Sequence, residues 1–511
     1  MTEPSGPDRH ASDPPHTADP TSGSHDTAAP RANPERALVA ERFDDWVQTL
    51  SEWLTIPSVS ADPARRGDVL RSAEFFADQL RQTGFPRVEV LNEGPYLPAV
   101  AAHWPSGDPD AVRVVLYGHH DVQPADGEER WTHPPFDPTV IDGVLHGRGA
   151  SDDKGNIATH LLGLTAHLRA TERSAPAVDL TVVVEGEEES GSTHVTELLA
   201  DVKTFMTRAG ADSADETDVI VVTDTGIFSA DTPSVVVGMR GMIAGELHVH
   251  GPDIDLHSGQ FGGAVPNPLA ELARLVAALH DDDGRIAVPG FYDGVIEPDA
   301  ADRAAIAALP FDEQAWLTGP AASRALAGEK GYSTLERLGA RPTAEVNGIY
   351  GGYTGPGGKT IVPTDGYAKL SFRLTGKQDP AHIRKVVDQF VADNLRDGLT
   401  AEIHWESDGV EPLYTDPKHP ATLATQRALG RAFDTDTVLI TREGGSGPES
   451  DLVQAFNAPM VFIGVMTPED QIHAPNEKAP LALLQKGCEA MAHLWRELAA
   501  VGRKQLRTSN G

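Results

Sequence analysis

The sequence predicts an α/β protein with a mostly parallel sheet, into which a smaller α+β domain is inserted. Two observations carry this prediction. Short apolar runs typical of buried strands alternate with helical stretches, which is the pattern of a parallel sheet. From about Ser234 the pattern changes to alternating strands, and a buried strand of the first kind returns only near Met460. The smaller domain is therefore expected inside the larger one rather than after it.

Metal-binding side chains follow four of the apolar runs, at the point where each strand ends. The runs cover residues 112–117, 180–184, 219–222 and 460–465. In open parallel sheets, ligands gather beyond the carboxyl ends of the strands. We therefore expect one shared site built from the side chains that follow these runs, namely His119, Asp121, Glu188, Glu189, Asp224 and His473.

The remaining elements follow from periodicity. Apolar residues at helical spacing predict helices near residues 35–54 and 68–83, and short strands follow over 88–91 and 99–103. The insertion reads as strand, helix, strand, strand, helix, strand, which is typical of a two-layer α+β domain. Its expected strands cover 243–250, 360–363, 367–374 and 401–405, its helices cover 268–280 and 381–395, and residues 281–350 are expected to be irregular and partly helical.

Four regions result from this reading. Residues 1–34 are rich in small and polar residues and cannot bury enough apolar surface to offset ordering, so we expect a disordered tail. Residues 35–237 and 407–511 are expected to form the two parts of the larger domain, and residues 238–406 the insertion.

The overall charge limits the classes of partner. The 511-residue chain has a formal net charge of −34, which argues against nucleic acid or an anionic membrane. Cys488 is the only cysteine, so neither an internal disulfide nor a cysteine-based zinc site is expected. No signal peptide and no apolar run long enough to span a bilayer is visible, so we expect a cytoplasmic protein.

The stretch over residues 145–168 carries two adjacent carboxylates, Asp152 and Asp153, immediately before a predicted helix. Two neighbouring aspartates at a helix start repel each other, and an N-cap needs only one of them. The plain alternative is an N-cap beside a solvated neighbour. A divalent cation would explain the second carboxylate, and the four strand ends favour that interpretation.

Mixed imidazole and carboxylate ligands suit zinc, manganese or cobalt better than calcium or magnesium. One bridging carboxylate, with one histidine and one further carboxylate for each ion, makes a two-metal site that can hold a hydroxide and polarise a carbonyl. An additional carboxylate beside it can move the proton. Taken singly, each residue has a plain alternative: a hydrogen-bonded histidine, a solvated acidic loop over residues 187–189, or a turn cap at Asp224.

At this point the chain resembles a known family, the co-catalytic metallopeptidases that include carnosinase, the cytosolic non-specific dipeptidase, peptidase V and carboxypeptidase G. The resemblance covers roughly residues 35–503, and the long insertion and the D-L-H-S-G stretch point to the dipeptidase branch. The motifs that carry it are Y-G-H-H-D-V-Q-P (117–124), G-R-G-A-S-D-D-K-G (147–155), E-E-S-G-S (188–192), V-T-D-T-G (222–226), D-L-H-S-G-Q-F-G-G (255–263), R-E-G-G-S (442–446) and I-H-A-P-N-E (472–477).

The resemblance implies a role for each ligand. Asp152 would bridge two divalent ions, with a cis peptide to Asp153. One ion would be held by His119 and Asp224, and the other by Glu189 and His473.

The resemblance also implies the catalytic groups. Glu188 would be the general base, and the following Ser190-Gly191 assigns this role within the run of three glutamates. Asp121 would orient His119, as carboxylates behind metal ligands do. His257, from the inserted domain of a partner subunit, would stabilise the oxyanion, which implies a homodimer through that domain.

Substrate contacts come from the resemblance as well. Arg373 would bind the free carboxylate of the substrate, and Thr360, Gly445 and Ser446 match further contact positions. Two positions depart from the family pattern: Asp408 stands near where the eukaryotic dipeptidases carry a histidine, and Gly447-Pro448-Glu449-Ser450 replaces an apolar continuation.

The expected function is therefore hydrolysis of dipeptides through a metal-bridged hydroxide, with Glu188 as general base. Two alternatives stay open: an N-acyl-amino-acid deacylase or carboxypeptidase of the same family, and a non-catalytic metal-binding scaffold protein. The metal site cannot separate the first alternative from a dipeptidase, because both share it.

Overall fold

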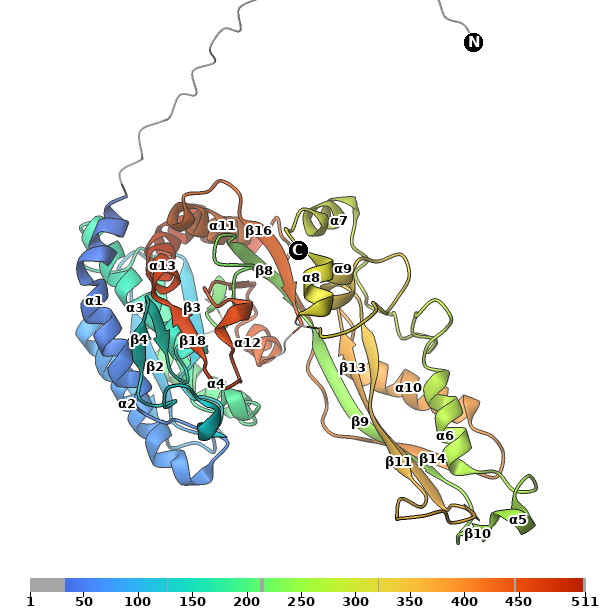
Figure 1. Ribbon diagram of the computed structural model, residues 1–511. Coiled ribbons are helices and arrows are strands. Elements are labelled where there is room, and N and C mark those ends of the chain that lie inside the picture. The colour runs from blue at the N-terminus through green and yellow to red at the C-terminus, as the bar shows by residue number, and fades with distance from the viewer. Residues whose placement is uncertain (1–32, 126, 212–215, 320, 445–446, 509–511) are drawn as a thin grey trace, which may run out of the picture.

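A computed structural model describes residues 33–125, 127–211, 216–319, 321–444 and 447–508 of the chain. The expected disordered tail lies outside these ranges except for Asn33 and Pro34. Asn33 accepts a hydrogen bond from the backbone N–H of Arg36 and caps helix α1 (Pro34–Leu54). Figure 1 shows two lobes, one built around the central sheet and one elongated lobe that ends at α5 (Ser258–Phe261) and β10 (Leu256–His257).

The central sheet has six strands in the order β1-β2-β6-β3-β7-β17. The four neighbours β6, β3, β7 and β17 run parallel, whereas β1 and β2 join antiparallel at one edge. These four are the strands predicted to end in metal-binding side chains, so the mostly parallel sheet is confirmed. Their bounds are β1 (Arg87–Leu91), β2 (Ala99–Trp104), β3 (Arg113–His119), β6 (Asp179–Glu185), β7 (Val219–Val222) and β17 (Met460–Phe462).

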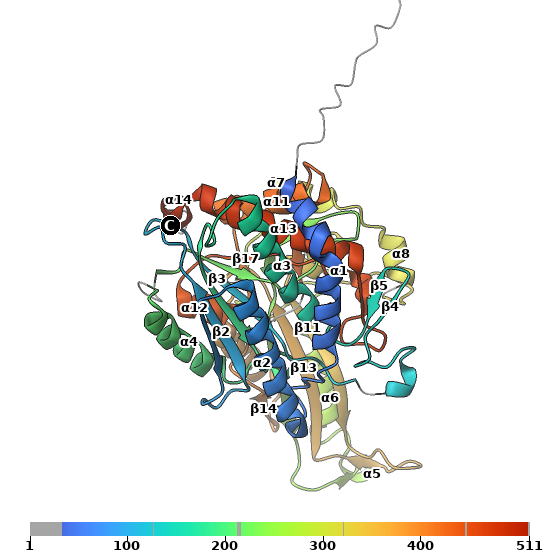
Figure 2. The ribbon, with the colours of Figure 1, turned by 90° about the vertical axis from the view of Figure 1, so that its left-hand side faces the viewer.

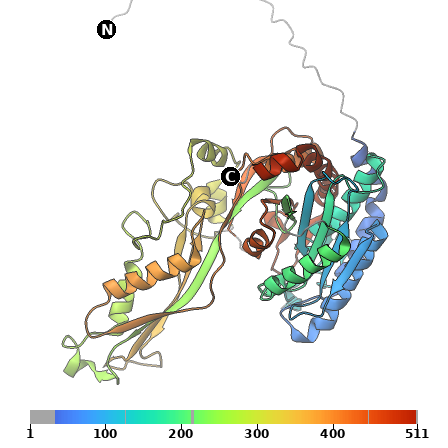
Figure 3. The same ribbon diagram turned by 180° about the vertical axis from the view of Figure 1, so that it is seen from behind.

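Helices cover both faces of this sheet (Figures 2 and 3). One apolar core joins the sheet to α1, to four further long helices and to Leu506 of the short helix α14 (Arg503–Thr508), and a second core joins the opposite face to α4 and α12. The helices are α2 (Arg66–Thr83), α3 (Lys154–Ala170), α11 (Pro420–Phe433) and α13 (Leu481–Val501) on the first face, and α4 (Val195–Ala209) and α12 (Glu449–Phe456) on the second.

Two small sheets bring distant segments to the edge of the central sheet. In one, β18 pairs with β5, which sets the segment after His473 against the turn that leads into α3. In the other, β8 lies between β15 and β16 and continues through Arg240 into the elongated lobe. The strands are β4 (Thr139–Ile141), β5 (Val144–His146), β18 (Lys478–Pro480), β8 (Ser234–Met239), β15 (Leu413–Tyr414) and β16 (Leu439–Glu443).

The elongated lobe is the inserted α+β domain. Its antiparallel sheet has the order β11-β13-β9-β14, and α6 and α10 pack on one face over a separate apolar core (Figure 3 shows α10 along the sheet). The elements are β9 (Gly241–His250), β11 (Thr343–Gly351), β13 (Asp365–Leu374), β14 (Thr400–Trp405), α6 (Pro268–Ala277) and α10 (Pro380–Asn394). The boundaries expected at 237/238 and 406/407 stay predictions, and they fall near the ends of β8 and β14.

One predicted strand forms but does not belong to this sheet. Residues 361–362 form β12 (Ile361–Val362), which pairs with β10 (Leu256–His257) in a separate ribbon. The fourth strand of the sheet is instead β11, from the stretch expected to be irregular. A register shift between Val346 and Gly348 interrupts its alternation, so the period of two that marks a strand is lost from the sequence.

Five short helices complete the described residues. Helices α7 (Ala300–Ala307), α8 (Glu313–Thr318) and α9 (Thr334–Gly339) lie at the junction of the lobes, α5 (Ser258–Phe261) at the tip, and α14 (Arg503–Thr508) at the end. No helix in the described part of the chain is both long enough and apolar enough to cross a membrane.

Candidate metal centre and active site

The carboxylate of Asp152 lies between two histidines. His119 Nε2 is 3.1 Å from Asp152 Oδ1, and His473 Nε2 is 3.0 Å from Oδ2. Asp224 Oδ2 lies 3.8 Å from His119 Nε2, and Glu189 Oε2 lies 3.3 Å from His473 Nε2. The five predicted ligands therefore meet at one place, with one carboxylate turned toward both imidazoles.

Two groups of potential ligands result from this convergence. Among the described residues, ligand atoms of His119, Glu188 and Asp224 lie within 4.8 Å of one another, as do those of Asp152, Glu189 and His473. Oδ2 of Asp152 faces His473, and its other oxygen, Oδ1, faces His119. The arrangement therefore fits a pair of cations that share this carboxylate. Mixed imidazole and carboxylate donors of this kind suit zinc, manganese or cobalt.

The strand ends explain the convergence. His119 is the last residue of β3, Glu188 opens a 3₁₀ turn just after β6, and Asp224 follows β7 by two residues. These strands are parallel neighbours, so their carboxyl ends meet at one edge of the sheet. His473 comes from the loop after β17 and adopts a left-handed backbone conformation with φ 59°.

The turn before α3 holds Asp152 in place. The peptide bond between Asp152 and Asp153 is cis. Asp153 does not cap the helix through its side chain; its Oδ2 accepts hydrogen bonds from Thr223 Oγ1 at 2.6 Å and from the backbone N–H of His119 at 3.2 Å. The plain N-cap alternative is therefore wrong for Asp153, whose buried carboxylate ties the turn to β3 and β7.

Sequence reasoning missed the group that supports this turn. Buried Glu477 accepts backbone hydrogen bonds from Gly149, Ser151 and Asp152, each at 3.1 Å, and pairs with Arg148 at 2.8 Å. In the sequence, the indication of this supporting role is the position of Glu477 at the end of the I-H-A-P-N-E motif.

Asp121 connects His119 to the loop after β6. Its carboxylate lies 3.4 Å from His119 Nδ1 and accepts the backbone N–H groups of Glu188 at 3.2 Å and Glu189 at 3.0 Å. Gln123 in turn donates to Glu189 Oε2 at 2.6 Å. The neighbouring Glu187 is directed elsewhere, because its carboxylate accepts the backbone N–H groups of Leu97 and His194.

Crowding of buried charge shifts the pKa values of the cluster. Burial, with the negative charges of Asp121, Glu189 and Asp152, raises the pKa of Glu188 to about 8, against a smaller lowering by His119. Burial and the charge of Asp152 hold the pKa of Asp224 well above its usual range. Hydrogen bonds to Asp152 and Glu189 raise the pKa of His473 to about 10. So many carboxylates in one buried place favour a bound cation.

Two predicted site residues lie elsewhere. His257 and Thr360 meet at the tip of the inserted lobe, where the backbone N–H of Ser258 donates to the carbonyl of Thr360 at 3.0 Å (β10 and α5 in Figure 1). His257 is exposed, and its Nδ1 accepts the N–H of Gly259. The two residues therefore lie on one short ribbon, in which His257 pairs with Ile361.

The described residues include only one of the other predicted substrate contacts. Gly445 and Ser446 lie outside the described residues. Arg373 lies half-buried on β13, opposite Met242 of β9. Asp408, the first departure from the family pattern, is exposed and pairs with Arg384 at 3.0 Å.

The second departure lies beside Glu188. A Cβ atom on Gly447 would come 3.2 Å from Glu188 Oε1 and 2.9 Å from Glu449 Oε1. Burial raises the pKa of Glu449, whose Oε2 accepts the backbone N–H of Gly447 at 2.8 Å. The absence of a side chain at position 447 therefore keeps room next to the predicted base.

Arg240 is a second residue that sequence reasoning missed. It lies between β8 and β9, and burial together with the charge of Arg373 lowers its pKa to about 10. Its Nε is buried and has no hydrogen-bond partner among the described residues. The carboxylate of Glu345 offsets part of the repulsion between Arg240 and Arg373, and the two guanidinium groups are candidates for binding an anion. Its setting in G-M-R-G, at a junction of strands, was the only signal.

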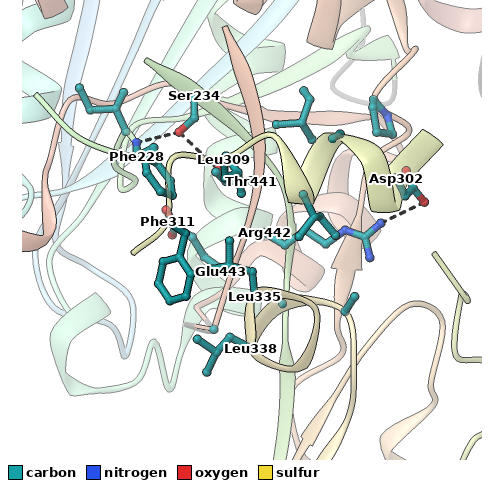
Figure 4. Close-up of a pocket in the computed structure, with 18 of the residues that line it drawn as sticks. Phe228, Ser234, Asp302, Leu309, Phe311, Leu335, Leu338, Thr441, Arg442 and Glu443 are labelled. Carbon is teal, nitrogen blue, oxygen red and sulfur yellow. Dashed lines mark hydrogen bonds and ion pairs between the residues drawn. The ribbon is translucent and has the colours of Figure 1, made fainter. Parts of the chain in front are cut away.

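Arg240 also lines a cavity of about 980 Å³ between the lobes, and Gly226, two residues after Asp224, is another of its lining residues. Figure 4 shows apolar side chains around it, including Phe228, Leu309 and Phe311, and the Arg442 guanidinium turned toward Asp302 at 3.5 Å. The cavity therefore lies beside the metal-binding cluster and not over it.

The protein combines a mostly parallel sheet, a cluster of histidines and carboxylates at the carboxyl ends of its strands, and an inserted antiparallel lobe. These three features define its class. Residues 115–497 match the family "Peptidase family M20/M25/M40", and the chain belongs to this family. This confirms the predicted resemblance and the predicted peptidase activity, and it favours an enzyme over a scaffold protein.

Individual relatives agree with this assignment. The chain is 30% identical to the Beta-Ala-His dipeptidase of Homo sapiens, over 89% of this chain and 90% of the relative. It is 27% identical to the Cys-Gly metallodipeptidase dug1 of Schizosaccharomyces pombe, over 91% of this chain and 98% of the relative. The solved structure of the M20 family metallo-carboxypeptidase Sso-CP2 from Sulfolobus solfataricus superposes with a TM-score of 0.72 at 26% identity. The superposition covers 89% of this chain and 100% of that chain.

Proposed function

We propose that the protein is a dipeptidase that uses two divalent metal ions per subunit. The observation that carries the proposal is Asp152, whose two carboxylate oxygens face two different histidines at 3.1 and 3.0 Å. The dipeptidase names of the relatives support the substrate class.

The ligand set is proposed as follows. Asp152 bridges the ions, His119 and Asp224 complete one site, and Glu189 and His473 complete the other. Zinc or manganese fits these donors, with cobalt as a further option. When bound, the ions polarise the scissile carbonyl and make the attacking water more acidic.

Glu188 is the proposed general base. Its Oε2 lies 4.0 Å from His119 Nε2, so it borders the cluster, and its raised pKa suits proton transfer near neutral pH. Glu188 takes a proton from the attacking water and delivers it to the nitrogen of the leaving amino acid. Asp121 positions both partners, because it contacts His119 and the backbone of Glu188.

The free carboxylate of the dipeptide would be bound by Arg373 together with Arg240. A guanidinium binds a carboxylate through two parallel hydrogen bonds, and the buried Nε of Arg240, which has no hydrogen-bond partner in the described part of the chain, favours such a ligand. His257 and Thr360 would complete the site from a partner subunit, in a homodimer formed through the inserted lobe. A cytoplasmic location belongs to the same proposal.

The test is Glu188→Gln in the metal-loaded protein, assayed on a panel of dipeptides with metal content measured in parallel. We expect kcat to fall about 10²–10⁴-fold while both ions stay bound, because a general base contributes that much to rate. Glu187→Gln is the matched control, since its carboxylate contacts Leu97 and His194 and should leave kcat nearly unchanged. Activity near wild type in Glu188→Gln would end this assignment.

The metallo-carboxypeptidase relative favours one alternative, hydrolysis of N-blocked or longer substrates. Comparing kcat/KM for free and N-acetylated forms of the same dipeptide separates the two. Preference for the free amine supports a dipeptidase, and preference for the blocked amine supports a deacylase or carboxypeptidase.

A further inference from the structure

The inserted sheet carries histidines on the face that its helices leave uncovered. Along β9, Leu247 and Val249 are buried in the core beneath α6 and α10, so the alternating His248 and His250 lie on the opposite face, where both are partly exposed. Glu402 of β14 stands directly opposite His248 in the antiparallel register and shares this face. Neighbouring strands therefore place two imidazoles and a carboxylate side by side.

The three side chains converge closely enough for one ion. One nitrogen of His248, one nitrogen of His250 and one carboxylate oxygen of Glu402 lie within 4.8 Å of one another. A third histidine borders them: the His404 ring centroid is 4.3 Å from that of His248, and its Nε2 is 3.1 Å from Glu402 Oε1.

Further carboxylates stand behind the two imidazoles of β9. His248 Nε2 lies 2.6 Å from Glu246 Oε1, and His250 Nδ1 contacts Asp365 Oδ1. Histidines that bind metal ions commonly donate their other ring N–H to a carboxylate, which fixes the ring and makes the ligand nitrogen more basic. These contacts engage Nε2 of His248 and Nδ1 of His250, so each ring has one further nitrogen that can bind a cation.

The charge of the cluster also favours a cation. The carboxylates of Glu246, Asp365 and Glu402 contact these histidines and place three negative charges around them. Lys369 lies 4.0 Å from Glu246, and its side chain is 61% exposed, so it is a weak counter-charge.

We propose that His248, His250 and Glu402 form a Zn²⁺ site on the inserted lobe, independent of the ions of the proposed active site. Two histidines, one glutamate and an open fourth position are a ligand set that zinc accepts. Ligands about 2.0–2.1 Å from a tetrahedral zinc stand about 3.3 Å apart. The Glu402 side chain is 60% exposed and can rotate to close the remaining separation. A bound ion would join strands β9 and β14 of the lobe.

Zinc stoichiometry of the full-length protein tests the proposal, by equilibrium dialysis against micromolar Zn²⁺. Glu402→Gln and the double variant His248→Gln/His250→Gln are compared with wild type, and circular dichroism checks that each variant is folded. We expect wild type to bind one Zn²⁺ per chain more than either variant, and Glu246→Gln to weaken this one ion about 10–100-fold. His382→Gln is the matched control, because His382 also pairs with a carboxylate, Asp293, at 3.1 Å on the same lobe.

Repeating the dialysis in an Asp152→Asn background separates this site from the proposed active site. In the Asp152→Asn background, the ion that Glu402→Gln removes should still be bound, even when the ions of the proposed active site are lost. Equal stoichiometry in wild type and in the folded Glu402→Gln and His248→Gln/His250→Gln variants would overturn the proposal, as would loss of the additional ion in His382→Gln. Because the readout is bound zinc, the result does not depend on whether the protein cleaves dipeptides.

Discussion

The carboxylate of Glu477 accepts a 3.1 Å hydrogen bond from the backbone N–H of Asp152, although 325 residues separate the two in the chain. The same carboxylate holds Gly149 and Ser151, so it organises the whole turn that presents Asp152. Burial raises the pKa of Glu477 to about 6, against the opposing charge of Arg148. Glu477 therefore supports the turn that carries Asp152, and we assign it a positioning role for the proposed metal centre.

Glu477→Gln should therefore weaken metal binding. The amide keeps the size of the side chain but replaces one acceptor oxygen by a donor, which cannot accept the converging backbone N–H groups. We expect metal affinity to fall about 10–100-fold, the range found for groups that support metal ligands. Chelator competition followed by metal analysis measures this, and activity restored by excess metal would distinguish positioning from catalysis. Unchanged affinity would contradict the assigned role.

Asp152→Asn should release both ions of the proposed active site, whereas His473→Asn should weaken mainly one of them. The reason is that Asp152 faces both histidines, while His473 contacts only Asp152 and Glu189 within the cluster. Metal stoichiometry under a stepwise chelator titration measures the difference. If Asp152→Asn, combined with Glu402→Gln to remove the proposed ion of the inserted lobe, kept one ion at wild-type affinity, a bridging role for this carboxylate would be excluded.

Arg240→Ala and Arg373→Ala should each raise KM for dipeptides about 10–100-fold, because a hydrogen bond to a charged group contributes about 1.5–3 kcal/mol. Wild type should discriminate by a similar factor against dipeptides whose carboxylate is amidated. Each variant should lose that discrimination, which gives the assay a readout that misfolding would not produce.

The control for this prediction is Arg442→Ala. Arg442 lines the same cavity but turns toward Asp302, so its loss should leave the preference for a free carboxylate intact. Equal discrimination in Arg240→Ala and wild type would remove Arg240 from the proposed site.

The sequence predicted best where local pattern and sheet topology agree. Apolar runs followed by His119 or Asp224 mark strand ends, and parallel strands bring such ends to one edge whatever lies between them. β11 was missed because its register shift breaks the alternation that identifies a strand. The roles of Arg240 and Glu477 could not be predicted from the residues alone, since each depends on contacts between segments that are distant in sequence.

A buried histidine gives a prediction for pH that is independent of catalysis. His160 on α3 is buried, its ring lies 5.7 Å from that of Trp495, and neither ring nitrogen has a hydrogen-bond partner among the described residues. Burial lowers the pKa of His160 to about 3. Below pH 6.5 the unfolded chain therefore binds a proton at this histidine that the folded protein does not, so the free energy of unfolding falls as the pH drops from 6.5 toward 3.

His160→Leu removes this titration and keeps an apolar side chain of similar size in the core. The loss in wild type is about 1.4 kcal/mol for each pH unit below 6.5, so the variant should gain about 2 kcal/mol relative to wild type between pH 7.5 and pH 5.0. Urea unfolding of both proteins at the two pH values measures the gain. Other groups that titrate in this range, including the metal ligands, are common to both proteins and cancel in the difference. A difference in unfolding free energy that stays the same at both pH values would show that His160 titrates alike in the folded and unfolded chains.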